Sequence, residues 1–416
     1  MTGTFKGRIA VLLSGSVLAQ VLPLLASPLL SRLYSPESFG QFGVYAALAS
    51  ILGALANLKY DHAVLLSKTA SLAFHMFAVC LFATIALAVV LAAAILAIPH
   101  AWYHSRWLVI DQSFAFWLPV SLILTGLTQA LLAMLFREQQ YQVVAKVRVI
   151  QASVGTGLSL LAGMWMPSGA LLIASTILAQ GAGAALLVIL RDKQRRFVAK
   201  LRWRVLYYCI ARYRRFPMFT ASADLVNAFT ANVPMLFIGS IYGLQLAGAY
   251  AFAQRTLGSP LMLISSAFSD VYRQAAAASF SRTGDYRAEA LKTFRTLLAV
   301  AVVPATVCVL AAPWVFRVLF GSDWIVAGDV AQVLALAYFS RLVFSPITFN
   351  YYLANRHRED LVLQCLNLSL TLALFFAAKS SDMAFMHVMS LYSMLLFLVY
   401  VVYGLRSLEF SRRSGL

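Results

Sequence analysis

Three arginines stand out because each lies within or at the end of a long apolar segment. Arg255 and Arg341 lie well inside such segments, and Arg32 lies at the end of the first one. A guanidinium group is costly to bury in hydrocarbon unless it faces a partner or water, so we expect these side chains to line a polar space. A planar guanidinium fork binds diphosphate-like anions through paired hydrogen bonds. The three arginines therefore form the predicted substrate site. The alternatives are a structural pairing role for Arg255 and Arg341 and snorkelling to the membrane surface for Arg32.

Asp224 and Asn227 form a second candidate site. With Thr220 they are spaced i, i+4 and i+7, which places the three side chains on one face of a helix. A carboxylate at this position would neutralise an arginine, bind a coupling proton or accept a hydrogen bond from a sugar hydroxyl. The competing interpretation is an ion pair between Asp224 and the basic segment that precedes it.

Catalytic and metal chemistry find little support in the sequence. It contains no phosphate-binding loop, no GxSxG or HExxH motif and no acidic cluster. The four cysteines show no CxxC spacing, so neither a disulfide framework nor a zinc site is indicated. His100 and His104 lie among aromatic residues, which favours a membrane-interface belt over a metal site. We therefore expect no catalytic residue, no bound metal and no cofactor, and we expect any uphill transport to use an H⁺ or Na⁺ gradient or the membrane potential.

The composition is typical of a membrane protein that crosses the bilayer many times. Of 416 residues, 61% are hydrophobic and only 12% are charged, and the mean hydropathy is +0.80. The net charge of +18 is carried by residues between apolar runs, which favours a role in membrane topology over nucleic-acid binding. The first apolar segment is longer than the core of a secretion signal and is expected to be the first span.

Twelve apolar segments are long enough to cross a bilayer as helices of about 20 residues. They predict an all-α fold of two six-helix lobes, in which both lobes enter the membrane from the same side as parallel repeats. The predicted spans are residues 9–30, 39–58, 71–98, 113–136, 150–166, 170–190, 217–241, 247–270, 296–320, 327–354, 361–379 and 384–405.

A basic connector between the two apolar halves predicts the orientation. Arg191 to Pro217 contains ten of the 33 basic residues of the chain and a single acidic residue. Basic segments of this kind stay on the cytoplasmic side during insertion. We therefore expect an N-terminal lobe at 1–190, a cytoplasmic connector at 191–216 and a C-terminal lobe at 217–416, with both termini in the cytoplasm.

One stretch of about 40 residues resembles a known family. The sequence PLLSRLYSPESFGQFGVY from Pro28 to Tyr45, followed by KYDHAVLL from Lys59 to Leu66, is similar to the N-terminal signature of Wzx-type polysaccharide flippases of the multidrug/oligosaccharidyl-lipid/polysaccharide exporter superfamily. The resemblance implies a V-shaped, MATE-like fold. It also implies a place in the inner membrane of a bacterial cell, where the protein would translocate undecaprenyl-diphosphate-linked oligosaccharide repeat units from the cytoplasmic to the periplasmic leaflet for O-antigen, capsule or exopolysaccharide synthesis. Arg32 is the residue to which the cavity-lining role of the family carries over.

The resemblance also implies partners, and two other functions remain as alternatives. The expected partners are the lipid-linked oligosaccharide, membrane lipids, and a polysaccharide polymerase with its chain-length regulator. A cation-coupled multidrug exporter of the same superfamily would use carboxylates rather than arginines in its cavity. A membrane-embedded polysaccharide polymerase or ligase would be expected to carry large periplasmic loops with catalytic residues, whereas the predicted outer loops are short.

Overall fold

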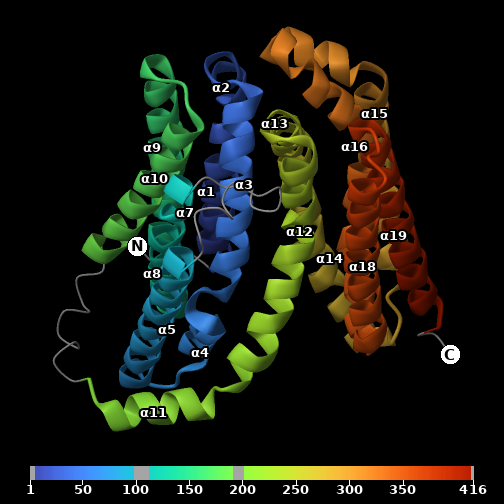
Figure 1. Cartoon of the computed structure of the whole chain (residues 1–416). Coiled ribbons are helices and arrows are strands. Elements are labelled where there is room, and N and C mark those ends of the chain that lie inside the picture. Colours follow the sequence, from blue (N-terminus) through green and yellow to red (C-terminus); the bar gives the residue numbers. More distant parts are fainter. Residues whose placement is uncertain (1–4, 98–111, 191–200, 414–416) are drawn as a thin grey trace. The chain divides into compact units, whose positions relative to one another are not determined.

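The computed structural model describes residues 5–97, 112–190 and 201–413, and every regular element in these ranges is helical (Figure 1). The first part of the basic connector, residues 191–200, lies outside the described residues, as do His100 and His104. Contacts between Cα atoms group the chain into two units, residues 1–247 and residues 248–416. The all-α architecture expected from the sequence is therefore confirmed.

The first unit contains most of the N-terminal helices and also the helix that follows the basic connector. Its elements are α1 (Phe5–Leu25), α2 (Ser27–Leu33), α3 (Pro36–Leu55), η1 (Ala56–Lys59), α4 (Tyr60–Leu66), α5 (Ala70–Ala97), α7 (Gln112–Ala115), α8 (Trp117–Arg137), α9 (Tyr141–Trp165), α10 (Gly169–Leu190), α11 (Trp203–Arg212), η4 (Phe216–Thr220) and α12 (Ala221–Tyr242). The helix α12 belongs to this unit because it packs along α3. The contact grouping thus differs from the sequence-based boundary, which placed residues from 217 onwards in the C-terminal lobe.

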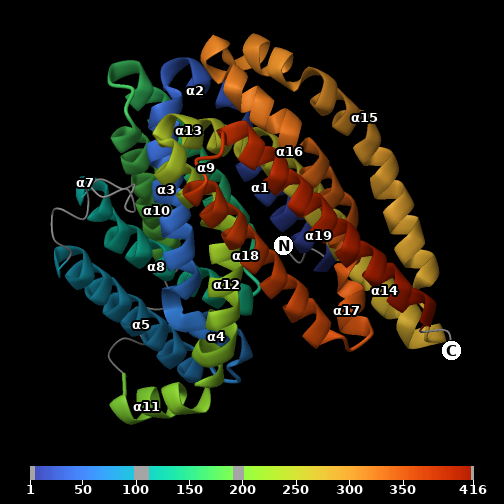
Figure 2. The same cartoon turned by 45° about the vertical axis from the view of Figure 1, so that its right-hand side comes forward.

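The second unit begins within α13 (Leu244–Ala253). The elements that follow are η5 (Gln254–Gly258), α14 (Ser259–Thr283), α15 (Arg287–Phe320), η6 (Ser322–Trp324), α16 (Ile325–Phe344), η7 (Ser345–Phe349), α17 (Asn350–Leu353), α18 (His357–Ser380) and α19 (Phe385–Arg413). The helix α16 packs between α15 and α19, and Figure 2 shows the long α15 running along one side of this unit.

Eleven helical segments of the described chain are long and apolar enough to cross a membrane. They correspond to eleven of the twelve predicted spans. The eighth predicted span, 247–270, coincides with the helical stretch formed by α13, η5 and α14, which is not among the eleven. Its lower hydropathy has a simple cause, since Gln254, Arg255 and Asp270 interrupt it together with several serines.

The turn between α2 and α3 is built by residues of the sequence signature quoted above. The hydroxyl of Ser35 accepts a hydrogen bond from the backbone N–H of Ser38 and so caps the start of α3, where Pro36 occupies the first turn. Tyr34 is buried and donates a hydrogen bond to the carbonyl of Ser159 on α9, at 2.7 Å. These signature residues hold the first helices against the rest of the unit.

The connector contains a short amphipathic helix, α11, which the sequence analysis did not predict. Figure 1 shows α11 lying across the end of α5, and its buried Leu206 and Cys209 belong to a core cluster with Met76 and Cys80 of α5. Burial raises the pKa of the Cys209 thiol above its usual value. Large aromatic side chains, including Trp203 and Tyr207, remain exposed. A helix of this pattern, basic with exposed aromatics, suits the membrane interface.

Candidate functional site

The second spanning segment is a broken helix, and the break is the most unusual backbone feature of the first unit. Three successive residues, Asn57, Leu58 and Lys59, have φ of 59°, 47° and 60°. Residues other than glycine pay about 1–3 kcal/mol each for this left-handed conformation, so neighbouring structure must hold it in place. Such breaks are tolerated at membrane depth only where the released backbone groups find partners.

Asn57 is completely buried, and Thr84 and Gly126 supply the partners of its backbone and side chain. Its backbone N–H donates to the Thr84 hydroxyl at 3.1 Å, and the same hydroxyl donates to the Asn57 carboxamide oxygen at 2.7 Å. The Asn57 amide nitrogen donates to the carbonyl of Gly126 at 3.0 Å. The break is therefore fixed by α5 and α8, and its geometry determines where Lys59, the last residue of the break, points.

Lys59 forms an ion pair with Asp224 of α12. The Lys59 nitrogen lies 2.7 Å from the Asp224 carboxylate, and the two side chains are 15% and 39% exposed. A second contact between α12 and the second spanning segment joins the amide of Asn232 to the hydroxyl of Ser50 in α3 at 3.2 Å. These contacts fix α12 antiparallel to α3. The candidate carboxylate Asp224 thus pairs with a cation of the second span, and the described part of the connector supplies no partner for it.

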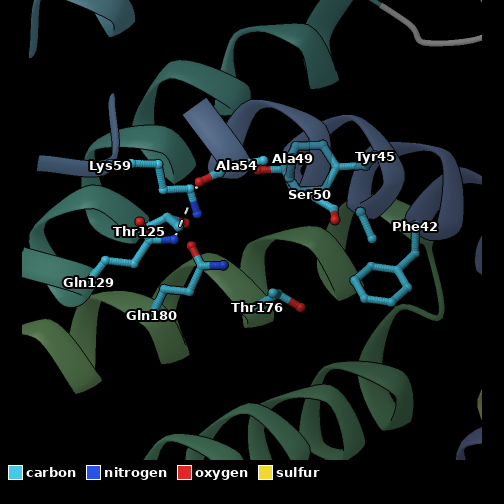
Figure 3. Close-up of a pocket in the computed structure, with 12 residues that line it drawn as sticks. Phe42, Tyr45, Ala49, Ser50, Ala54, Lys59, Thr125, Gln129, Thr176 and Gln180 are labelled. Carbon is cyan, nitrogen blue, oxygen red and sulfur yellow. Dashed lines mark hydrogen bonds between the residues drawn. The ribbon is translucent and has the colours of Figure 1, made fainter. Parts of the chain in front are cut away.

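A cavity of about 390 Å³ lies beside this ion pair, lined by residues of α3, η1, α8 and α10 (Figure 3). Phe42, Tyr45, Ala49 and Gly53 form the α3 wall, at helical spacings that put them on one face. Lys59 is the only charged residue among the twelve that line the cavity. Its volume falls in the range of about 300–1,000 Å³ typical of small-molecule sites.

Two helices each contribute a threonine and, one turn later, a glutamine. Thr125 and Gln129 come from α8, and Thr176 and Gln180 come from α10. Figure 3 shows the ends of Lys59, Gln129 and Gln180 converging on the same part of the cavity. The Gln129 amide donates to the carbonyl of Gly53 at 3.3 Å, and the Gln180 oxygen accepts from Ser121 at 3.3 Å. The polar part of the lining thus consists of carboxamides, hydroxyls and one ammonium group, and the rest of it is apolar.

The sequence analysis did not select these residues, although a signal for them exists. Thr-x-x-x-Gln occurs in two predicted spans, at 125–129 and at 176–180. Tyr60, Ala63 and Val64 of α4, which follow Lys59, are buried in the core of the unit. The contact of Lys59 with Asp224 was not predicted, because the two residues are far apart in the sequence.

The predicted cationic residues occupy different environments. Arg32 is exposed in the last turn of α2. Arg341 of α16 is half-buried in the second unit, where its guanidinium lies 5.9 Å from the centre of the Tyr400 ring. Buried Tyr338 and Tyr392 lie near Arg341 as well. Arg341 therefore has the aromatic surroundings that stabilise a guanidinium within a membrane span.

Arg255 lies in η5, a five-residue π-helical turn that interrupts the helical stretch from α13 to α14. Its side chain is half-buried, and η5 packs against α16. Widened turns of this type recur at functional sites, because they re-aim side chains within an otherwise regular helix. Asn227, by contrast, is exposed on α12. Arg255 and Arg341 thus lie on neighbouring elements of one unit, while Arg32, Asp224 and Asn227 lie in the other.

Within residues 5–97, 112–190 and 201–413, no group of three or more His, Cys, Asp or Glu side chains is placed to hold a metal ion.

Comparison with known proteins places the chain in a family. Residues 29–329 match the model of a family described as polysaccharide biosynthesis protein, which covers well over half of the chain. No curated protein sequence matches significantly. The family match confirms the resemblance drawn from the N-terminal signature.

Solved structures supply the fold. An inward-facing multidrug resistance MATE family transporter of the MOP superfamily superposes with a TM-score of 0.68 at 13% identity, covering 98% of this chain and 99% of that one. A MOP superfamily transporter from Pyrococcus furiosus, described as having a binding pocket of reverse polarity, gives 0.58 at 13% identity over 98% and 96%. A eukaryotic MATE transporter gives 0.54 at 14% identity over 98% and 96%. The chain is a multi-pass membrane protein of the polysaccharide biosynthesis protein family, and it has the fold of the MATE transporters.

Proposed function

We propose that this protein is a flippase that moves undecaprenyl-diphosphate-linked oligosaccharide units from the cytoplasmic to the periplasmic leaflet of the bacterial inner membrane. The observation that carries the proposal is the match of residues 29–329 to the polysaccharide biosynthesis protein family. A fold shared with transporters supports movement of a substrate rather than its chemical conversion. The product would enter O-antigen, capsule or exopolysaccharide synthesis, through a polymerase and its chain-length regulator.

The physical problem for such a protein is the polar head group, because a diphosphate with sugars cannot cross hydrocarbon unaided. Arginines within the spans would hold the diphosphate, and Arg341 and Arg255 have half-buried positions that suit this role. Arg32 would contact the head group at the end of the first span. An inside-negative membrane potential favours outward movement of the anionic head by about 2.3 kcal/mol per charge per 100 mV. Coupling to an H⁺ or Na⁺ gradient is the other source of energy that we consider.

A second candidate function is export of cationic drugs, favoured by the similarity to a multidrug resistance MATE transporter. Arginines within the spans repel such substrates, which argues for the flippase. A polymerase or ligase is the candidate from another class, and purified protein that extends lipid-linked sugars would favour it.

Replacement of Arg341 in the bacterial strain that makes the surface polysaccharide, called here the producing strain, tests the proposal. We expect Arg341→Ala to lower surface polysaccharide at least about tenfold, the equivalent of about 1.4 kcal/mol, while membrane protein levels stay unchanged. Arg341→Lys should restore part of the export because it keeps the charge but loses the fork. The matched control is Arg282→Ala, an exposed arginine at the end of α14.

Normal polysaccharide export by Arg341→Ala would refute the role of this arginine. A deletion strain that accumulates ethidium yet displays normal polymer would favour the drug exporter.

A further inference from the structure

The cavity of the first unit has the properties of a binding site that the arginines do not use. It lies between α3, η1, α8 and α10, and none of its lining residues belongs to the predicted cationic site. Its volume of about 390 Å³ is that of a small-molecule site rather than of a packing defect. The cavity combines apolar walls with several polar side chains, as small-molecule sites do.

The polar groups of the cavity retain hydrogen-bonding capacity. The side-chain hydroxyl of Thr125 has no hydrogen-bond partner in the described residues, and a hydroxyl can both donate and accept. Gln180 uses its oxygen to accept from Ser121, and no described residue accepts from its amide nitrogen. Thr176 donates to the carbonyl of Leu172 and keeps its acceptor lone pairs. Donors and acceptors in close alternation match hydroxyl groups, which also donate and accept.

The charge of the cavity selects among polar ligands. Its single charged lining residue, Lys59, is already neutralised by Asp224 at 2.7 Å. A small cation would meet an ammonium group, and an anion would have to compete with the carboxylate. The ligand that fits is therefore uncharged. The half-buried ring of Phe42 on the α3 wall provides an apolar face for the C–H groups of such a ligand (Figure 3).

We propose that this cavity binds one uncharged sugar ring of the translocated lipid, with Thr125 and Gln180 bonding to its hydroxyl groups. The assignment rests on the proposed function, because it gives the sugars of the substrate their own site, separate from the arginines expected to hold the diphosphate. Loss of the two hydrogen bonds at about 1 kcal/mol each is expected to weaken sugar-dependent binding about tenfold to thirtyfold.

The test uses full-length protein in lipid nanodiscs and two probes. These are undecaprenyl diphosphate without sugar and the native lipid-linked repeat unit extracted from the producing strain. Wild-type protein is expected to bind the glycosylated lipid about tenfold or more tighter than the bare one. Thr125→Val combined with Gln180→Leu removes the hydrogen-bonding groups at similar volume. We expect this double variant to bind both lipids equally, with unchanged affinity for the bare lipid.

Two controls keep the result interpretable. Thr306→Val makes the same threonine-to-valine replacement at an exposed position of α15, outside the cavity. This variant should bind both lipids as wild type does. The single variant Thr125→Ser, which leaves Gln180 unchanged, retains the hydroxyl. It should keep the preference for the glycosylated lipid, and it remains informative if the double variant folds poorly. Thermal unfolding reports folding in each case.

The outcomes separate the two proposals. A double variant that retains the full preference for the glycosylated lipid overturns the sugar site and leaves the flippase standing. Equal binding of both lipids by wild-type protein also overturns the sugar site. Failure of wild-type protein to bind either lipid overturns the flippase proposal, and the sugar site with it.

Discussion

At the scale of single residues, the ion pair between Lys59 and Asp224 is the most informative contact of the first unit. The two partners are buried to different extents, since the Lys59 side chain is 15% exposed and the Asp224 side chain 39%. Removal of the carboxylate leaves an ammonium group with little access to solvent, whereas removal of the lysine leaves a carboxylate that solvent reaches. Loss of Asp224 is therefore expected to cost more stability than loss of Lys59.

We predict that Asp224→Ala destabilises the protein more than Lys59→Ala does. The cost of stranding the ammonium is expected to be about 1–3 kcal/mol. The double variant should lose less stability than the sum of the two single variants, because the two residues interact directly. The midpoint of thermal unfolding in detergent measures all three. Equal effects that add up in the double variant would show that the ion pair contributes nothing.

At the scale of elements, the central feature is the break between α3 and α4, which α5 and α8 hold in place. Gly126 allows the close approach that this requires. A Cβ atom on Gly126 would clash with the hydroxyl oxygen of Thr84, the same oxygen that bonds to Asn57. The break, the packing of α5 on α8 and the position of Lys59 are thus parts of one arrangement.

Gly126→Ala is predicted to destabilise the protein by about 1–3 kcal/mol, because the added methyl group forces α5 and α8 apart. Gly157→Ala on α9 is the matched control, since a Cβ atom there meets nothing within 4 Å. Exchange of glycine for alanine in open helical surroundings is neutral or stabilising. Thermal unfolding of the two variants should therefore differ in sign or in size. Similar midpoints for both would contradict the proposed packing.

The positions of the spans could be predicted from the sequence, whereas the break in the second span could not. Hydropathy located the spans, because length and apolar content decide which segments enter a bilayer. It did not predict the break at Asn57, since Asn-Leu-Lys contains neither glycine nor proline and follows an apolar run. The partners that impose the break, Thr84 and Gly126, are distant in sequence, and only the folded unit brings them together.

Some residues of the candidate sites could likewise be predicted from the sequence, and others only from the folded structure. Charges within spans could be selected from the sequence alone, because their burial is costly wherever they point. The partner of Asp224 could not, since it depends on α12 packing along α3. The cavity was missed for a different reason. Thr125 and Gln180 are unremarkable singly, and their significance comes from three helices meeting around one space.

At the scale of the whole molecule, the distribution of basic residues predicts the orientation of the chain. The segments expected inside carry most of the Lys and Arg residues, including ten in the connector. Retention of these residues in the cytoplasm should place both termini there. We predict that a green fluorescent protein fused after Leu416 is fluorescent, and that an alkaline phosphatase fused after Gly321, in the turn between α15 and α16, is active. Inactive phosphatase at Gly321 would invert the assignment.

The most direct test of the whole account is transport by the purified protein. Proteoliposomes carrying it are loaded with fluorescently labelled undecaprenyl-diphosphate-linked oligosaccharide, and a membrane-impermeant quencher reports the fraction in the outer leaflet over time. The account predicts that the labelled lipid exchanges between leaflets in wild-type vesicles, and that exchange falls at least about tenfold with Arg341→Ala. Exchange no faster than in protein-free vesicles, or equal exchange by wild type and Arg341→Ala, would contradict it.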